Sequence, residues 1–178
     1  ASDVYKRQEL GCYFSHLNVL KKFLTTNEDF ALVCEDDIEF NKDIIQIING
    51  ALNSSIHFDL LRLSGGSDRN KEKGIPIKLQ KIYKDFYLSL NLGFKSGTGC
   101  YLINRHAAKN ILNKLNKMSL PIDHAMDRDW LLSLRSLSIS PAPVYLKEEL
   151  HEGNSYIQAK SEFKYSFYRR SVSYTHLT

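Results

Sequence analysis

One apolar run that ends in acids constrains the fold of this chain more than any other stretch. Residues 30–34 are Phe-Ala-Leu-Val-Cys, and Glu35, Asp36 and Asp37 follow without interruption. A short run rich in Val and Leu is typical of a buried strand in an α/β sheet. Ligands of open α/β sheets bind beyond the carboxyl ends of the strands. The pattern therefore predicts a ligand site at the three acids.

The three acids need a cation, a proton or free access to water. If the strand continues through them, alternation places Glu35 and Asp37 on one side and Asp36 on the other. Two carboxylates about 5 Å apart repel each other by roughly 3 kcal/mol at an effective dielectric constant near 20. Mg²⁺ and Mn²⁺ prefer carboxylate oxygens and often share their coordination shell with a substrate phosphate. A divalent-cation site is one interpretation, and a solvated acidic turn is the other.

The remaining hydrophobic pattern predicts a mixed α/β domain. Apolar residues at three- and four-residue intervals predict helices over residues 9–24, 41–52, 104–116 and 125–134. Asn41 and Asn104 are the expected N-caps of the second and third helices. Apolar runs predict strands over residues 58–64 and 97–103, and one or two short strands over residues 82–90. Residues 65–78 are interpreted as a long exposed loop, and residues 140–145, with two prolines, as an extended segment.

Composition narrows the class of protein. The chain has 178 residues, 43% of them hydrophobic and 25% charged, which suits a single globular domain. The formal net charge of +4 is too small to indicate nucleic-acid binding. The three cysteines, Cys12, Cys34 and Cys100, are far apart and lack zinc-ligand spacing, so they are interpreted as free thiols in a reducing compartment.

The two ends of the chain are expected to be foreign to the natural gene. Residues 3–8 and 172–177 match two reading frames of one transposon-derived sequencing adapter, on opposite strands. We therefore expect adapter-derived residues over 1–8 and 171–178 and natural sequence over 9–170. The alternative is that both ends are genuine terminal segments.

Four stretches, in their order and spacing, resemble glycosyltransferase family 25, the lipopolysaccharide and lipooligosaccharide biosynthesis transferases. They are Gly11-Cys12-Tyr13-Phe14-Ser15-His16, Leu32-Val33-Cys34-Glu35-Asp36-Asp37, Gly97-Thr98-Gly99-Cys100-Tyr101-Leu102-Ile103 and Pro121-Ile122-Asp123. The resemblance implies a single-domain α/β fold of the GT-A type, the fold of nucleotide-diphospho-sugar transferases. It also implies transfer of a sugar, often galactose, from a UDP-sugar such as UDP-galactose to a lipooligosaccharide or other glycan acceptor, with inversion. Family members begin with a strand and a helix, and the strand supplies part of the uridine site. Both elements are expected to be missing here.

The resemblance also implies roles for individual residues. Asp37, with Glu35 or Asp36, would hold Mn²⁺ or Mg²⁺ against the donor diphosphate, where a divalent ion stabilises the charge on the leaving group. His151 would be a further metal ligand. Asp123 would take the proton of the acceptor hydroxyl, although an ordinary helix N-cap explains it equally well. The substrate-binding candidates are Ser15, His16, Gly97, Thr98, Asp127 and Asp129, and for His16 the competing explanation is a packed helical residue.

Two other functions stay open on the sequence. A metal-dependent phosphohydrolase or nuclease also places carboxylates at strand ends. A non-catalytic glycan- or partner-binding fragment would use the aromatic segment 83–90 and the basic segment 160–170. The family expectation for location is the cytoplasmic face of a bacterial membrane, and the basic segment is compatible with peripheral contact there.

Overall fold

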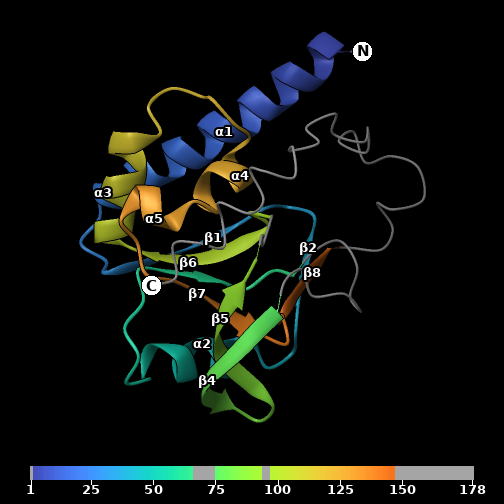
Figure 1. Cartoon of the computed structure of the whole chain (residues 1–178), viewed down its shortest axis with the longest axis vertical. Helices are drawn as coiled ribbons and strands as arrows, with labels where there is room; N and C mark the ends of the chain where they lie inside the picture. Colours follow the sequence, from blue (N-terminus) through green and yellow to red (C-terminus); the bar gives the residue numbers. More distant parts are fainter. Residues whose placement is uncertain (1, 66–74, 94–96, 147–178) are drawn as a thin grey trace.

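The computed structural model describes residues 2–65, 75–93 and 97–146, and a six-stranded mixed sheet forms its centre (Figure 1). The strands of this sheet are β1 (Phe30–Cys34), β3 (Leu60–Arg62), β4 (Ile75–Tyr83), β5 (Phe86–Leu92), β6 (Cys100–Asn104) and β7 (Ser136–Ser140). Their order across the sheet is β1-β6-β3-β7-β5-β4. The β3–β7 pair is parallel, and the other neighbouring pairs are antiparallel. The expected mixed α/β fold is confirmed.

Helices cover one face of the sheet at its β1–β6–β3 side (Figure 1). They are α1 (Ser2–Leu24), α3 (Arg105–Lys114), α4 (Ile122–Met126) and α5 (Asp129–Leu132). Alternate strand residues point toward them, so Leu60, Tyr101 and Ile103 are buried against Leu20 and Ile111. This is the larger helical layer, and it carries the first of two apolar cores.

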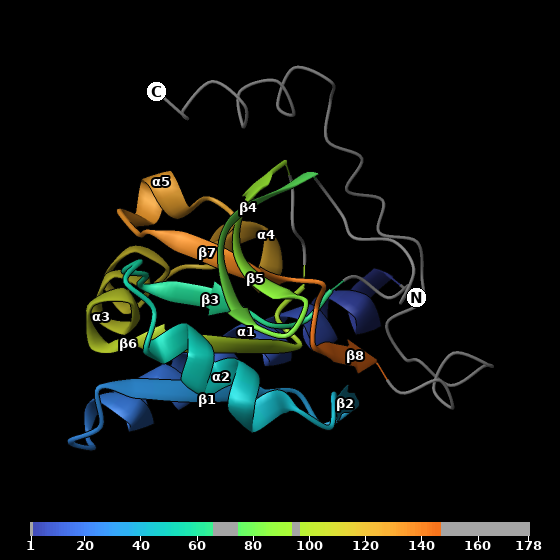
Figure 2. The same cartoon turned by 90° about the horizontal axis from the view of Figure 1, so that it is seen from below.

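The opposite face packs against α2 (Ile44–Leu52), which lies across the strands in Figure 2. The intervening strand residues point this way, and Leu61 and Leu102 are buried with Ile47 of the helix. Side-chain alternation along the central strands thus fills one core on each face of the sheet. Because both faces are covered, buried polar residues in these strands need hydrogen-bond partners within the protein.

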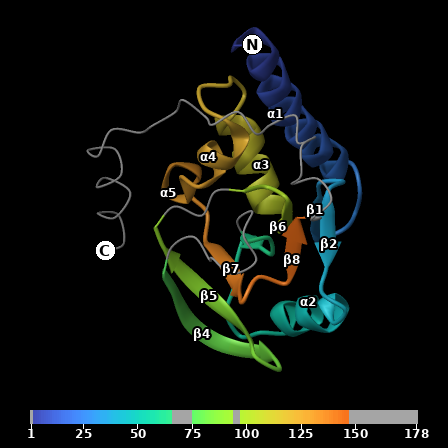
Figure 3. The same cartoon turned by 90° about the vertical axis from the view of Figure 1, so that its right-hand side faces the viewer.

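A small second sheet continues the chain after the acids. In it, β2 (Ile38–Phe40) pairs antiparallel with β8 (Val144–Leu146), and the two strands lie side by side in Figure 3. Val144 also bridges to Ser64, just beyond β3. The acidic segment is therefore a turn anchored at both ends, by β1 in the large sheet and by β2 in the small one.

Several elements differ from the sequence-based expectation. The first helix starts at Ser2 rather than residue 9. Asn41 does not cap the second helix, because its side chain accepts the N–H of Asp43 in a turn and the helix begins at Ile44. The expected helix over residues 125–134 is two short helices, α4 and α5. Asn104 does cap α3, accepting the N–H of Ala107 at 2.8 Å.

The acidic strand is also placed differently within the sheet. The sequence suggested a buried strand, but β1 lies at the edge, with Leu32 42% exposed and Cys34 exposed. The strand ends at Cys34, so Glu35, Asp36 and Asp37 occupy the following turn rather than alternating along a strand. Among the described residues, no helix is long and apolar enough to cross a membrane.

Candidate active site

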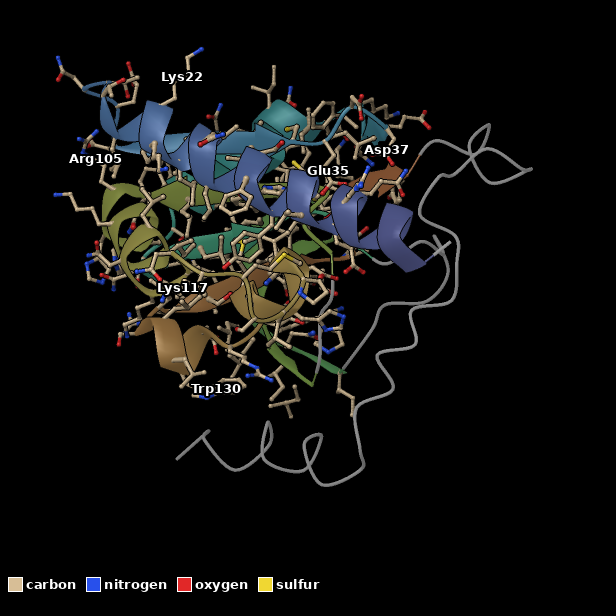
Figure 4. The ribbon with its side chains drawn as sticks, turned by 90° about the horizontal axis from the view of Figure 1, so that it is seen from above. Lys22, Glu35, Asp37, Arg105, Lys117 and Trp130 are labelled. Carbon is tan, nitrogen blue, oxygen red and sulfur yellow. The ribbon has the colours of Figure 1, made fainter. Side chains whose placement is uncertain are left out.

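Three segments meet at one end of the sheet. β1 and β3 run in the same direction because each pairs antiparallel with β6. The carboxyl ends of β1 and β3 therefore lie beside the amino end of β6. The acids follow β1, Arg62 ends β3, and Gly97 and Thr98 lie just before β6. Figure 4 shows Glu35 and Asp37 at this end beside α1, and Arg105 at the opposite end.

Glu35 is held by contacts from three directions. Its Oε1 accepts the Thr98 hydroxyl at 2.8 Å and lies 3.4 Å from Nε2 of His16. Its backbone N–H donates to the carbonyl of Gly99 at 2.8 Å. The hydrogen bond from His16, together with that from Thr98, lowers the pKa of Glu35 although burial opposes the shift. The carboxylate is therefore fixed in position and ionised near neutral pH.

His16 lies between Glu35 and the core. His16 is 5% exposed, and its Nδ1 is 2.9 Å from the hydroxyl of Tyr101. Burial raises the pKa of Tyr101, so the phenol keeps its proton. Nδ1 of His16 can therefore accept the Tyr101 hydroxyl while Nε2 faces the Glu35 carboxylate. In this structure, His16 is both a packed residue and a positioning contact for Glu35.

Arg62 is a site residue that the sequence reasoning missed. Arg62 is 3% exposed. Its Nη2 lies 2.8 Å from Oδ1 of the buried Asp127 side chain, and its Nη1 donates a hydrogen bond of 2.7 Å to the carbonyl of Gly97. A single arginine within the apolar run 58–63 was the available signal, because a charge in a buried strand requires a partner. Gly97 has φ +124°, a conformation that residues with a side chain rarely adopt. Arg62 therefore joins Asp127, at the end of α4, to the loop that carries Thr98.

The charges of three carboxylates act on Cys12 of α1. Burial first, and then the charges of Glu35, Asp123 and Asp37, raise the pKa of Cys12 to about 11. Asp123 is the expected base, and Glu35 and Asp37 are two of the expected metal ligands. Their negative charges all raise the pKa of this thiol, so the potential at the site is negative. Donor atoms of Cys12, His16 and Glu35 all lie within 4.8 Å of one another. Glu35 is the carboxylate of this group, and hard divalent cations prefer carboxylate oxygens.

The remaining candidate residues occupy varied positions around this site. Asp36 and Ser15 are exposed, and Asp37 is half-buried. Asp123, in the first turn of α4, accepts the N–H of His124 at 2.8 Å. Burial raises the pKa of Asp129 at the start of α5.

Two of these candidates, by contrast, are buried. Thr98 is 5% exposed and the Asp127 side chain 6%, and their hydrogen-bonded partners are Glu35 and Arg62. His151 lies outside the residues that the structure describes.

The chain is similar to one known protein family. The family model described as Glycosyltransferase family 25 (LPS biosynthesis protein) matches residues 6–126. The matched span includes all but the first four residues of α1, together with the acidic turn, Arg62, Thr98 and Asp123. No curated protein matches the chain. Because the match covers more than half of the sequence, the chain belongs to glycosyltransferase family 25, and the protein is a sugar transferase of lipopolysaccharide biosynthesis.

Proposed function

We propose that this transferase moves galactose from UDP-galactose to a lipooligosaccharide or related glycan acceptor, with inversion, in a reaction that uses Mn²⁺ or Mg²⁺. The observation that carries the proposal is the turn after β1, where Glu35 is fixed and ionised beside Asp37 and shares a negative site with Asp123. The family supplies the reaction class, and the donor set supplies the argument for a cation.

Glu35 and Asp37, with Asp36 at the exposed side of the turn, are the proposed cation ligands, and His151 remains a proposed further ligand. When bound, the cation would neutralise the diphosphate and stabilise the charge that develops on it as the glycosidic bond breaks. Thr98 and His16 would support this role indirectly, because each donates a hydrogen bond to Glu35 and keeps its carboxylate ionised.

Asp123 is the proposed general base. An inverting transfer needs one group that takes the proton of the acceptor hydroxyl as its oxygen attacks the anomeric carbon. Asp123 is half-buried and close enough to the acids to act on the same thiol, Cys12. The exposed Ser15 and the half-buried Asp129 are the proposed contacts for substrate. We place the reaction at the cytoplasmic face of a bacterial membrane, as expected for the family.

Calorimetric titration of UDP into the full 178-residue chain, with and without Mn²⁺, tests the proposal. We expect binding that requires Mn²⁺ and that weakens at least about tenfold, roughly 1.4 kcal/mol, in Asp37→Asn. Glu39→Gln is the matched control, since Glu39 is an exposed acid two residues further on, in β2. UDP binding that is independent of Mn²⁺, or that is equally strong in Asp37→Asn, would contradict a cation site at this turn.

A further inference from the structure

Cys34 and Cys100 face each other across the β1–β6 pair. They are direct partners in the antiparallel register, and their Sγ atoms are 3.5 Å apart. The neighbouring pair of residues, Glu35 and Gly99, is hydrogen-bonded, because the N–H of Glu35 donates to the carbonyl of Gly99. Hydrogen-bonded and non-hydrogen-bonded pairs alternate along an antiparallel ladder. Cys34 and Cys100 therefore form a non-hydrogen-bonded pair, whose Cα atoms are about 4.5 Å apart, within the range of roughly 4.4–6.8 Å that disulfides adopt. The backbone is already close to the geometry of a disulfide.

The two thiols differ in their access to solvent. Cys34 is exposed at the edge strand, whereas Cys100 is 1% exposed in the core against α2. A small oxidant in solution therefore meets Cys34 first, and Cys100 is in contact behind it. The third thiol, Cys12, packs against the core on the other face of the sheet, so the sheet separates it from this pair.

We propose that Cys34 and Cys100 form a redox-active dithiol that a peroxide closes to an intramolecular disulfide, which locks β1 to β6 beside the acidic turn. The sulfur of Cys34 attacks one peroxide oxygen, the O–O bond breaks, and the thiol proton leaves with the departing oxygen as water. The sulfur of Cys100 then attacks the Cys34 sulfenic acid, and the second water carries away the sulfenic oxygen and the Cys100 proton. Two thiols lose two electrons in total, and hydrogen peroxide is reduced to two waters.

The disulfide would act on the candidate active site through the backbone. The sulfur atoms must move from 3.5 Å to about 2.05 Å. Cys34 directly precedes Glu35, and Cys100 follows Thr98 by two residues, so the movement changes the position of the Thr98 hydroxyl relative to the Glu35 carboxylate. This consequence rests on the proposed function of the acidic turn, whereas formation of the disulfide does not.

The test treats the full chain with hydrogen peroxide and counts its free thiols by alkylation and mass spectrometry. We expect the three free thiols to fall to one, with Cys34 and Cys100 in one linked peptide, Cys12 still alkylated, and all three thiols restored by dithiothreitol. Cys34→Ala, at an exposed position, and Cys100→Ala should each prevent the linkage, and Cys12→Ala should leave it intact. The proposal would be overturned if Cys100 stayed a thiol while Cys34 became a sulfinic acid or formed a disulfide with a second chain. It would also be overturned if the Cys34 thiol were not lost.

A second measurement compares Mn²⁺-dependent UDP binding by the reduced and the disulfide forms. We expect a several-fold weaker affinity in the disulfide form, with recovery after reduction. Equal affinity of the two forms refutes the effect of the disulfide on the acidic turn. If the reduced protein binds no UDP, the proposed function fails, and the dithiol is then judged by thiol counting and the linked peptide.

Discussion

Asp127→Asn tests whether the buried ion pair with Arg62 holds this end of the sheet together. The two side chains are 6% and 4% exposed, and Oδ1 of Asp127 lies 2.8 Å from Nη2 of Arg62. Asparagine keeps the shape of the side chain, but the buried guanidinium loses the negative charge that compensates it. Removing one partner of a buried pair costs about 3–5 kcal/mol. The total free energy of unfolding of a domain is only about 5–15 kcal/mol, so this is a large fraction of it.

The loss should be visible in thermal and in urea unfolding. At roughly 2–4 °C per kcal/mol for a chain of this size, the midpoint of thermal unfolding should fall by about 6–20 °C. Asp85→Asn is the matched control: Asp85 lies 3.9 Å from Lys81, and these side chains are 95% and 57% exposed. Such a surface pair contributes less than about 1 kcal/mol. If Asp127→Asn lowers the free energy of unfolding no more than Asp85→Asn does, the reasoning about the buried pair is wrong.

Three further predictions concern a backbone conformation, a helix cap and a titrating carboxylate. Gly97→Ala should lower the free energy of unfolding in urea by about 1–3 kcal/mol, because alanine is strained at the positive φ of this position. Gly11→Ala, in open space on α1, should raise the free energy of unfolding by up to about 1 kcal/mol. Equal effects of the two substitutions would contradict this reasoning. Asn104→Ala should lower the thermal midpoint because it removes the cap of α3, worth about 0.5–2 kcal/mol, and the hydrogen bond from Nδ2 of Asn104 to Asp59. An unchanged midpoint would show that neither contact contributes. The lowered pKa of Glu35 gives stability that is fully present above the ordinary glutamate pKa and is lost as the pH falls through the folded-state value. Thr98→Val removes one hydrogen bond to Glu35, so the stability difference from the parent should be largest near neutral pH and should shrink in acid; a pH-independent difference would refute this link.

Oxidation of the Cys34–Cys100 dithiol adds a prediction of a different kind, because it needs no substrate and no metal. A disulfide formed between residues separated by 66 positions should restrict the unfolded chain and raise the thermal midpoint. The same treatment of Cys34→Ala should leave the midpoint unchanged, and a fall in the midpoint of the oxidised parent protein would show that the disulfide strains the sheet.

The sequence by itself determined the features that depend on neighbouring residues. The apolar run before Glu35, the spacing of apolar residues in α1 and α3, and the cap at Asn104 are local patterns, and the structure contains each of them. Local patterns work because a helix or strand buries a fixed set of positions, whatever it packs against. The order of the four stretches was also enough to indicate the family, which the family match confirms.

Only the tertiary structure decided which polar groups meet. Nothing near His16 in the sequence indicates that it contacts Tyr101, 85 residues away, or that it holds Glu35. The partnership of Arg62 with Asp127 and the position of β1 at the sheet edge were equally inaccessible. The physical reason is that periodicity shows which side of an element is buried, whereas the partner of a buried polar group depends on how distant elements pack. Because such a group is stable only with a partner, the folded arrangement determines which residues can support the candidate site.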